Sequence, residues 1–315
     1  MSALKINGKI SSAVRSANIK GTNINSKTIK SILRYIILSV IAVFYITPLL
    51  IIFTNSLMSQ NEITRNYAGG FSLFDYAKAD QNNMHYAEYK LIPENVTLEQ
   101  YDSLFFKTPK YMDLFLNSIK LTIPIVVLQL LVGSLAAYGF TVNPSRQREI
   151  IFCIYIIIMI LPYQATLVPN YIIADKLGIL NSYLSIILPG TFHPFAVFIM
   201  RQSMKQIPAD VLNAAAIDGA SHFKRFIHIV VPMSKSGVAS LFILSFIDCW
   251  GMVEQPLVFI KDSVKEPLSV FLSQMSQDHI GLIFAASFFY MIPAVWVFLY
   301  GLDDFKNGVK LSAFK

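Results

Sequence analysis

The sequence predicts an all-α membrane protein that crosses the bilayer six times, and three observations support this fold class. Hydrophobic residues make up 54% of the 315 residues and charged residues only 14%, whereas a soluble domain carries about 25% charged residues. Six apolar runs are each long enough to cross the hydrocarbon core, for which a helix needs about 20 residues. The runs are continuous rather than alternating, which favours helices over the strands of a membrane barrel.

The six apolar runs set the predicted organisation of the chain. We place the transmembrane helices at residues 35–57, 115–142, 150–171, 182–204, 237–259 and 281–301. We therefore expect a basic N-terminal tail (1–34), a first helix (35–57), an extracytoplasmic loop (58–113), a five-helix core (114–301) and a C-terminal tail (302–315). The loop is rich in Tyr, Asn and acidic residues, so we expect it to form a small, partly ordered cap.

The basic residues predict how the helices are oriented in the membrane. With the N-terminus in the cytoplasm, 17 Lys and Arg residues fall in inner segments and eight in outer segments, as the preference of basic residues for the cytoplasmic side requires. Both termini are therefore expected to be cytoplasmic. The net charge of +7 is then mainly a sign of topology, so we expect membrane lipid and no nucleic acid as a partner.

The sequence contains no motif for enzymatic chemistry or for a bound cofactor. It has no phosphate loop, no His-Glu-x-x-His and no Gly-x-Ser-x-Gly. Cys153 and Cys249 both lie in apolar runs, which predicts neither a disulfide nor a cysteine metal site. His193 precedes Pro194, and we expect it to pack or to cap a helix. We therefore predict a non-enzyme that needs no cofactor and binds no metal.

The most informative stretch is the inner segment 205–236, which reads as two short helices. Pro208 suits the first position of a helix, Asp218-Gly219 provides a break with positive φ, and Ser221 is placed to cap the second helix. The second helix has apolar residues at helical spacing, which predicts one face covered by protein. These residues are Phe223, Phe226, Ile227, Val230 and Val231. On this pattern alone, a loop that simply packs beneath its own bundle is an equally good interpretation.

The segment also resembles the cytoplasmic Glu-Ala-Ala loop of binding-protein-dependent ABC importers. The matching residues are Asn213-Ala214-Ala215, Asp218-Gly219-Ala220 and Ile229-x-Val231-Pro232. The glycine and the following isoleucine are ten residues apart, as in that family. The match extends over some 25 residues. The family's usual Glu is replaced here by Asn213.

Further residues resemble the maltose-type carbohydrate permeases of that family, between about residues 34 and 308. They are Pro48, Asn55-Ser56-Leu57, Thr97-Leu98-Glu99-Gln100-Tyr101, Leu116-Asn117-Ser118, Asn170-Tyr171, 177–182 and Trp250. The resemblance implies a type I ABC importer permease fold. It also implies a second homologous permease subunit, a dimer of cytoplasmic ATPase subunits, an extracytoplasmic solute-binding protein and a carbohydrate substrate.

The resemblance implies that the loop couples the membrane domain to the ATPase. The coupling residues would be Asn213, Ala214, Ala215, Asp218, Gly219 and Ala220. Asn213 retains hydrogen-bonding groups but has no charge, so an ion pair made by the family's Glu is not expected here. The absence of a phosphate loop agrees with ATP hydrolysis in a separate subunit.

Polar residues within membrane spans are the candidates for the substrate pathway, because burying them in lipid is costly. They are Gln129, Gln164, Asn170, Asp248, Trp250 and Glu254. Trp250, flanked by Asp248 and Glu254, combines the aromatic face and carboxylates that suit a sugar, although helix packing explains each residue equally well. The alternative function is a stand-alone, ion-coupled secondary transporter that uses Asp248 and Glu254. The absence of an internal repeat argues against it.

Overall fold

The computed structural model describes residues 26–67, 90, 92–107, 110–142, 145–274 and 280–313. The chain divides into two compact units, Met1–Leu50 and Ile51–Lys315. Helix α2 (Ser26–Ser56) supplies the described residues of the first unit. The predicted all-α fold class is confirmed, because the described ranges contain helices and one isolated bridge between Met58 and Val96 but no strand.

The described residues of the second unit form long and short helices. Before the first long helix come α3 (Gln60–Tyr67), α4 (Glu99–Asp102) and the π-helix η2 (Ser103–Lys107). The long and medium helices are α5 (Lys110–Thr141), α6 (Arg146–Ile160), α7 (Tyr163–Lys176), α8 (Leu184–Thr191), α9 (Pro194–Met204), α13 (Lys235–Trp250) and α16 (Ile280–Ala313). The remaining elements are α10 (Ala209–Ile217), α11 (His222–Arg225), η3 (Phe226–Val230), α12 (Val231–Met233), α14 (Glu254–Phe259) and α15 (Leu268–Gln274).

Four helical stretches in the described part of the chain are individually long and apolar enough to cross a membrane. They are Lys30–Ser56, Lys110–Thr141, Leu184–Met204 and Ile280–Lys306. Two further spans are bent pairs, Arg146–Ile160 with Tyr163–Lys176 at 98° and His222–Met233 with Lys235–Trp250 at 76°. The described part of the chain therefore has up to six spans, two of which are bent.

The predicted helix at 150–171 is not continuous, because it breaks at Leu161 and Pro162. Leu161 is extended, with φ −61° and ψ 133°. A proline disfavours the helical conformation of the preceding residue and has no N–H for the helix ladder. The chain therefore turns at this point, and α7 leaves the direction of α6.

The predicted span at 237–259 is also wrong in its extent. Helix α13 ends at Trp250 and α14 begins at Glu254. Gly251 weakens the helix, and Pro256 has no N–H with which to bond the carbonyl of residue 252. The break places Asp248 and Glu254 on two different helices. A similar break at Phe192 and His193 separates α8 from α9.

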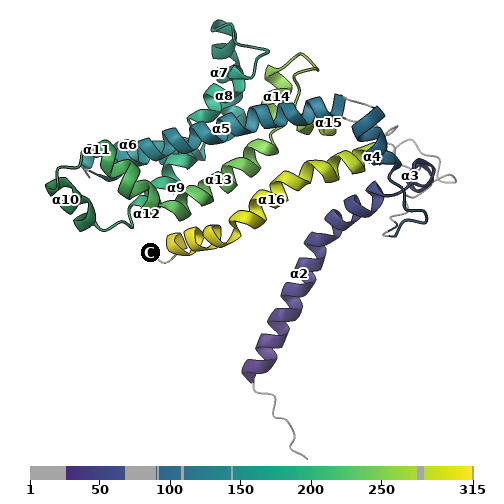
Figure 1. The fold of residues 1–315 in the computed structure, drawn as a ribbon, viewed down its shortest axis with the longest axis horizontal. Coiled ribbons are helices and arrows are strands. Elements are labelled where there is room, and N and C mark those ends of the chain that lie inside the picture. Colours follow the sequence, from purple (N-terminus) through teal and green to yellow (C-terminus); the bar gives the residue numbers. More distant parts are fainter. Residues whose placement is uncertain are drawn as a thin grey trace, which may run out of the picture. The chain divides into compact units, whose positions relative to one another are not determined.

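Helices α5, α9, α13 and α16 form the core of the second unit. In Figure 1, α5, α13 and α16 run side by side, with α10, α11 and α12 at one end and α4 and α15 at the other. Glycines permit close contacts: a Cβ on Gly133 would lie 2.9 Å from the Cβ of Ala196, and one on Gly237 would lie 2.3 Å from the Cβ of Ser203. Small residues at such crossings are typical of membrane helices.

The segment between α2 and α5 is ordered where the structure describes it. Glu62 is 4% exposed, and its carboxylate accepts hydrogen bonds from the backbone N–H groups of Glu94 at 2.8 Å and Asn95 at 3.4 Å. Two described parts of the predicted cap, far apart in sequence, are thus tied together. Residues 68–89 of the cap and residues 1–25 of the predicted basic tail lie outside the described residues.

Candidate functional site

The C-terminus of α10 has the hydrogen bonds of a Schellman motif. The N–H of Gly219 donates to the carbonyl of Ala216 at 3.1 Å, and the N–H of Ala220 donates to the carbonyl of Ala215 at 2.9 Å. This motif places a left-handed residue just after the helix, and Gly219 has φ 79°. The predicted break with positive φ is confirmed. It fixes the direction in which the chain leaves α10.

The second helix of the loop begins at the predicted cap. The Oγ of Ser221 accepts a hydrogen bond from the N–H of Lys224 at 3.3 Å, so Ser221 is the N-cap of α11. Pro208 lies one residue earlier than predicted, as the N-cap of α10 rather than its first helical residue. The tyrosine hydroxyl of Tyr138 in α5 donates to the carbonyl of His222 at 3.0 Å. This bond attaches the loop to the bundle.

The predicted apolar face of the second helix is only partly covered within this chain. Phe226 and Val230 are buried against Ala137, Met200 and other core residues. Phe223 and Ile227 are 66% and 42% exposed. Residues 226–230 form a π-helix, whose wider turn breaks the i, i+3, i+4 alignment on which the prediction rested. The loop is therefore anchored by Phe226 and Val230, with Ile207, Leu212 and Val231 packed beside them, and it exposes Phe223 and Ile227.

The six predicted coupling residues lie close together on the solvent side of the loop. Four of them, Asn213, Ala214, Asp218 and Gly219, are exposed, while Ala215 and Ala220 are half-buried. Ile217, between them, is 86% exposed. Helix α10 has no buried residue. A rigid, exposed element with an apolar side chain at its end is a surface suited to binding another protein.

Two of the six candidate pathway residues take part in packing. The amide of Gln129 is buried and donates to the carbonyl of Gly190 at 2.7 Å. Trp250 is 4% exposed, donates from Nε1 to the carbonyl of Tyr290 at 2.9 Å and stacks between Phe246 and Tyr290. These contacts satisfy both polar groups within the helix bundle. For these two residues the packing interpretation fits the structure.

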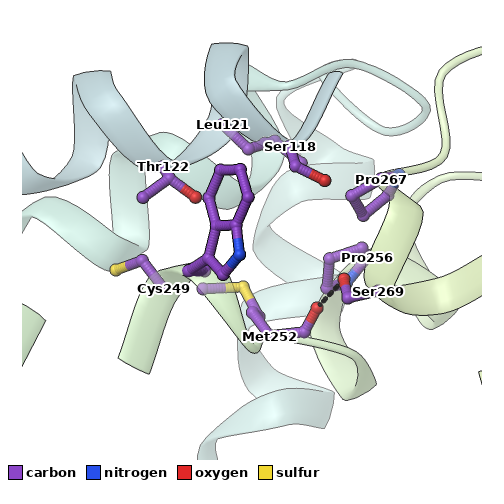
Figure 2. Close-up of a pocket in the computed structure, with 9 residues that line it drawn as sticks. Ser118, Leu121, Thr122, Cys249, Met252, Pro256, Pro267 and Ser269 are labelled. Carbon is purple, nitrogen blue, oxygen red and sulfur yellow. Dashed lines mark hydrogen bonds between the residues drawn. The ribbon is translucent and has the colours of Figure 1, made fainter. Parts of the chain in front are cut away.

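The cavity beside Trp250 is too small for a sugar. Figure 2 shows Ser118 and Thr122 on one side and, on the other, Ser269 donating a hydrogen bond to the carbonyl of Met252. The cavity has a volume of about 10 Å³, whereas even one water needs roughly 10–15 Å³. Substrate contact must therefore be sought at another face of the bundle.

Three other candidates lie together at an exposed face where the helices break. The amide of Gln164, in the first turn of α7, donates to both carboxylate oxygens of Glu254 at 3.2 and 3.3 Å. Asp248, near the end of α13, is exposed like both of these residues. The structure thus brings together carboxylate and amide groups from three helices. Asn170, the remaining candidate, is half-buried farther along α7.

Two residues of this exposed cluster were not among the predicted site residues. Tyr163 precedes Gln164 and lies near the carboxylates of Glu254 and Asp248, and His193 lies near the carboxylate of Asp248. His193 occupies the predicted capping position as the N-cap of α9, although its side chain makes no cap bond, and its ring lies edge-on to Phe195 with centroids 6.2 Å apart. Each residue is next to a proline at a helix break, Tyr163 after Pro162 and His193 before Pro194.

Comparisons with known proteins identify the family of the chain. Residues 129–301, more than half of the chain, match the family described as binding-protein-dependent transport system inner membrane component. The arabinooligosaccharides transport system permease protein AraQ of Bacillus subtilis is 28% identical over 226 residues, which cover 71% of this chain and 80% of AraQ. The osmoprotective compounds uptake permease protein GgtD of Synechocystis is 30% identical over 64% of this chain and 70% of GgtD.

A solved structure shares the fold. A crystal structure of a bacterial ABC transporter involved in import of the acidic polysaccharide alginate matches with a TM-score of 0.73 and 20% identity, over 89% of this chain and 98% of that one. The family match confirms the resemblance to binding-protein-dependent importers and leaves the stand-alone secondary transporter without support. The chain belongs to the family of binding-protein-dependent transport system inner membrane components, and it is a multi-pass membrane protein.

Proposed function

We propose that this chain is the permease subunit of an ATP-driven importer that moves a sugar or oligosaccharide delivered by an extracytoplasmic binding protein. The observation that carries the proposal is the exposed loop around Gly219, a fixed two-helix element with no buried residue in its first helix. The names of relatives that carry arabinooligosaccharides and lactose support a carbohydrate cargo.

The loop is the proposed contact with a dimer of cytoplasmic ATPase subunits. Ile217 and Phe223 are 86% and 66% exposed on either side of the turn, and exposed apolar groups of this size are typical of interfaces. The sequence has no phosphate loop, so the energy of ATP is expected to come from the partner. Asn213, exposed on α10, offers hydrogen bonds without charge at that contact.

The exposed cluster at the helix breaks is the proposed contribution of this chain to the substrate pathway. Carboxylates of Asp248 and Glu254 accept hydrogen bonds from sugar hydroxyl groups, and the amide of Gln164 orients Glu254. Polar side chains inside a membrane domain are retained where they face a cavity or another helix. The face is open in the single chain, which fits completion of the pathway by a second permease subunit.

The proposed topology places both termini and the loop at 205–236 in the cytoplasm, and the segment at 58–113 outside. It is tested by thiol labelling of single cysteines in intact cells, after replacement of Cys153 and Cys249. Ile92→Cys and Ile217→Cys provide matched positions, because these side chains are 80% and 86% exposed. An impermeant reagent should label position 92 alone. Labelling of position 217 alone would show that the orientation is the reverse of the one proposed.

The coupling role is tested by Gly219→Val, with Gly178→Val as the matched control. Both glycines have positive φ, 79° and 66°, and both have open space around the added Cβ, so each substitution costs about 1 kcal/mol in backbone strain. Both variants should assemble with the partner permease. Only Gly219→Val should lose sugar uptake and substrate-stimulated ATP hydrolysis together in reconstituted vesicles. An equal loss of uptake and stimulated ATP hydrolysis in both variants would indicate that the loop has only a packing role.

A further inference from the structure

An ion pair joins α6 to α9 beside the segment at 205–236. The guanidinium of Arg201, in the last turn of α9, donates to the carboxylate of Glu149, in the first turn of α6. Only 4% of the Arg201 side chain is exposed, whereas 46% of the Glu149 side chain is exposed. The guanidinium carbon lies 3.8 Å from the centroid of the Phe152 ring, which also belongs to α6. Arg201 therefore holds α6 by two contacts of different kinds.

The ion pair lies against the apolar cluster that anchors the loop. Phe152, on which the guanidinium stacks, is buried in the same cluster as Met204 of α9. The loop contributes Phe226 and Val230 to this cluster. Close-packed side chains transmit a displacement because they have little room to absorb it. A shift of the loop is therefore passed to α9 and to the α6 residue beneath the ion pair.

The other ends of α6 and α9 lead to the polar cluster at the helix breaks. Helix α6 ends at Ile160, and the chain then turns into α7, which begins at Tyr163. Helix α9 begins directly after His193. Tyr163 and His193 both lie near the carboxylate of Asp248. Each helix thus connects the ion pair to the same carboxylate of the proposed substrate pathway.

Stability alone is a poor explanation of this ion pair. Desolvation of a buried arginine offsets much of its Coulomb attraction, and apolar residues of similar volume often stabilise a fold equally well. The Nε of Arg201 is also buried without a hydrogen-bond partner among the residues that the structure describes. What the pair supplies is direction, because a charged hydrogen bond between two defined groups fixes their geometry more sharply than apolar packing does.

We propose that Arg201 is a positioning residue that locks α6 to α9, so that a displacement of the loop moves Tyr163 and His193 together. This inference rests on the proposed function, since it assigns a route from the ATPase contact to the substrate pathway. Without the lock, α9 moves with the loop while α6 lags behind it. ATP hydrolysis then continues, but less sugar is moved for each ATP.

The lock is tested by the distance between two spin labels in the complete importer, after replacement of Cys153 and Cys249. The labels are attached at Ile160→Cys, at the end of α6, and at Phe192→Cys, just before α9. These positions are 74% and 64% exposed. Distances are measured without nucleotide and with a nonhydrolysable ATP analogue. With an intact lock, the distance distribution should be equally narrow in both states.

Three variants distinguish the lock from general effects of charge. Arg201→Met fills a similar volume and leaves Glu149 half-exposed to water, so the chain should fold, and the ATP analogue should broaden the distance distribution. Arg201→Lys keeps the charge without the planar fork and should give an intermediate width. Arg146→Gln removes an exposed charge from the same turn of α6 and should match the wild type.

Coupling is measured in reconstituted vesicles as arabinotriose taken up per ATP hydrolysed. Arg201→Met should lower this ratio about tenfold, within the range by which residues between two coupled sites change the coupling. Adding Glu149→Gln should lower it no further, as expected for two partners in one interaction. A merely structural pair would instead lower the recovery of the complex and leave the ratio of the recovered complex at the wild-type value.

Three results would overturn the proposal. They are an unchanged distance distribution in Arg201→Met, an equal broadening in Arg146→Gln, and a wild-type coupling ratio in Arg201→Met. The distance measurement uses nucleotide and no sugar, so it decides on the lock even if the wild type does not carry arabinotriose. A lack of arabinotriose uptake by the wild type would count against the proposed cargo alone.

Discussion

The loop around Gly219 and the polar cluster around Glu254 are both exposed, but they are built in different ways. The loop is one continuous segment, and its shape is fixed by local hydrogen bonds at Gly219 and Ser221. The cluster combines the starts of α7 and α14 with the end of α13, and it exists only because these helices break. Local substitutions should therefore affect coupling at the loop, whereas the cluster depends on the packing of the bundle beneath it.

The largest expected effect is on that packing. Trp250→Ala should lower the free energy of unfolding by about 3–5 kcal/mol, because Trp250 is 4% exposed and stacks between two rings. Trp296→Ala is the matched control, since Trp296 is 66% exposed. The yield of folded chain and its resistance to denaturant measure both variants. Equal stability of the two variants would contradict the structural role of Trp250.

The next largest effect tests whether the Glu254 cluster acts in transport rather than in helix packing. Glu254→Ala should lower sugar uptake about tenfold, as expected when a hydrogen bond to a charged group is lost, while the amount of folded chain is unchanged because Glu254 is exposed. Glu254→Gln keeps hydrogen-bonding groups, so its sugar uptake should fall less than that of Glu254→Ala. Glu99→Ala, an exposed carboxylate on α4, should transport normally. Normal uptake by Glu254→Ala would exclude this residue from the pathway.

The smallest expected effect tests whether local hydrogen bonds of the loop contribute to coupling. Ser221→Ala removes the N-cap of α11, which is worth about 1 kcal/mol, so substrate-stimulated ATP hydrolysis should fall about two- to fivefold. Ser145→Ala removes the equivalent cap of α6 and should leave stimulation unchanged. If stimulated ATP hydrolysis is the same in both variants, the helix cap in the loop has no specific role in coupling.

The two regions also differ in how far the sequence predicts them. The turn at Asp218-Gly219 and the cap at Ser221 follow from residue types whose effects are local, and both are confirmed. The breaks that form the cluster were not predicted. Proline alone does not mark them, because Pro48, Pro124 and Pro293 lie inside continuous helices whereas Pro162 ends one. Neighbouring helices can compensate for a missing hydrogen bond in a membrane, so the outcome depends on tertiary contacts.

The sequence also does not predict which of the polar candidate residues are buried. Gln129 and Asp248 both stand in apolar runs and look equivalent in the sequence. The structure buries Gln129 against the carbonyl of Gly190 and exposes Asp248. Which face of a helix meets its neighbours is decided by contacts such as that between Gly133 and Ala196. A single sequence does not contain this information.

The account is tested most directly by cross-linking the loop to its proposed partner. A photoreactive amino acid replaces Ala214 in the reconstituted importer, and a second variant carries it at Ala165, an alanine on α7 that is also exposed. Position 214 should form a covalent adduct with the ATPase subunit, and position 165 should not. An adduct from position 165 but none from position 214 would contradict the assignment of this loop as the coupling element.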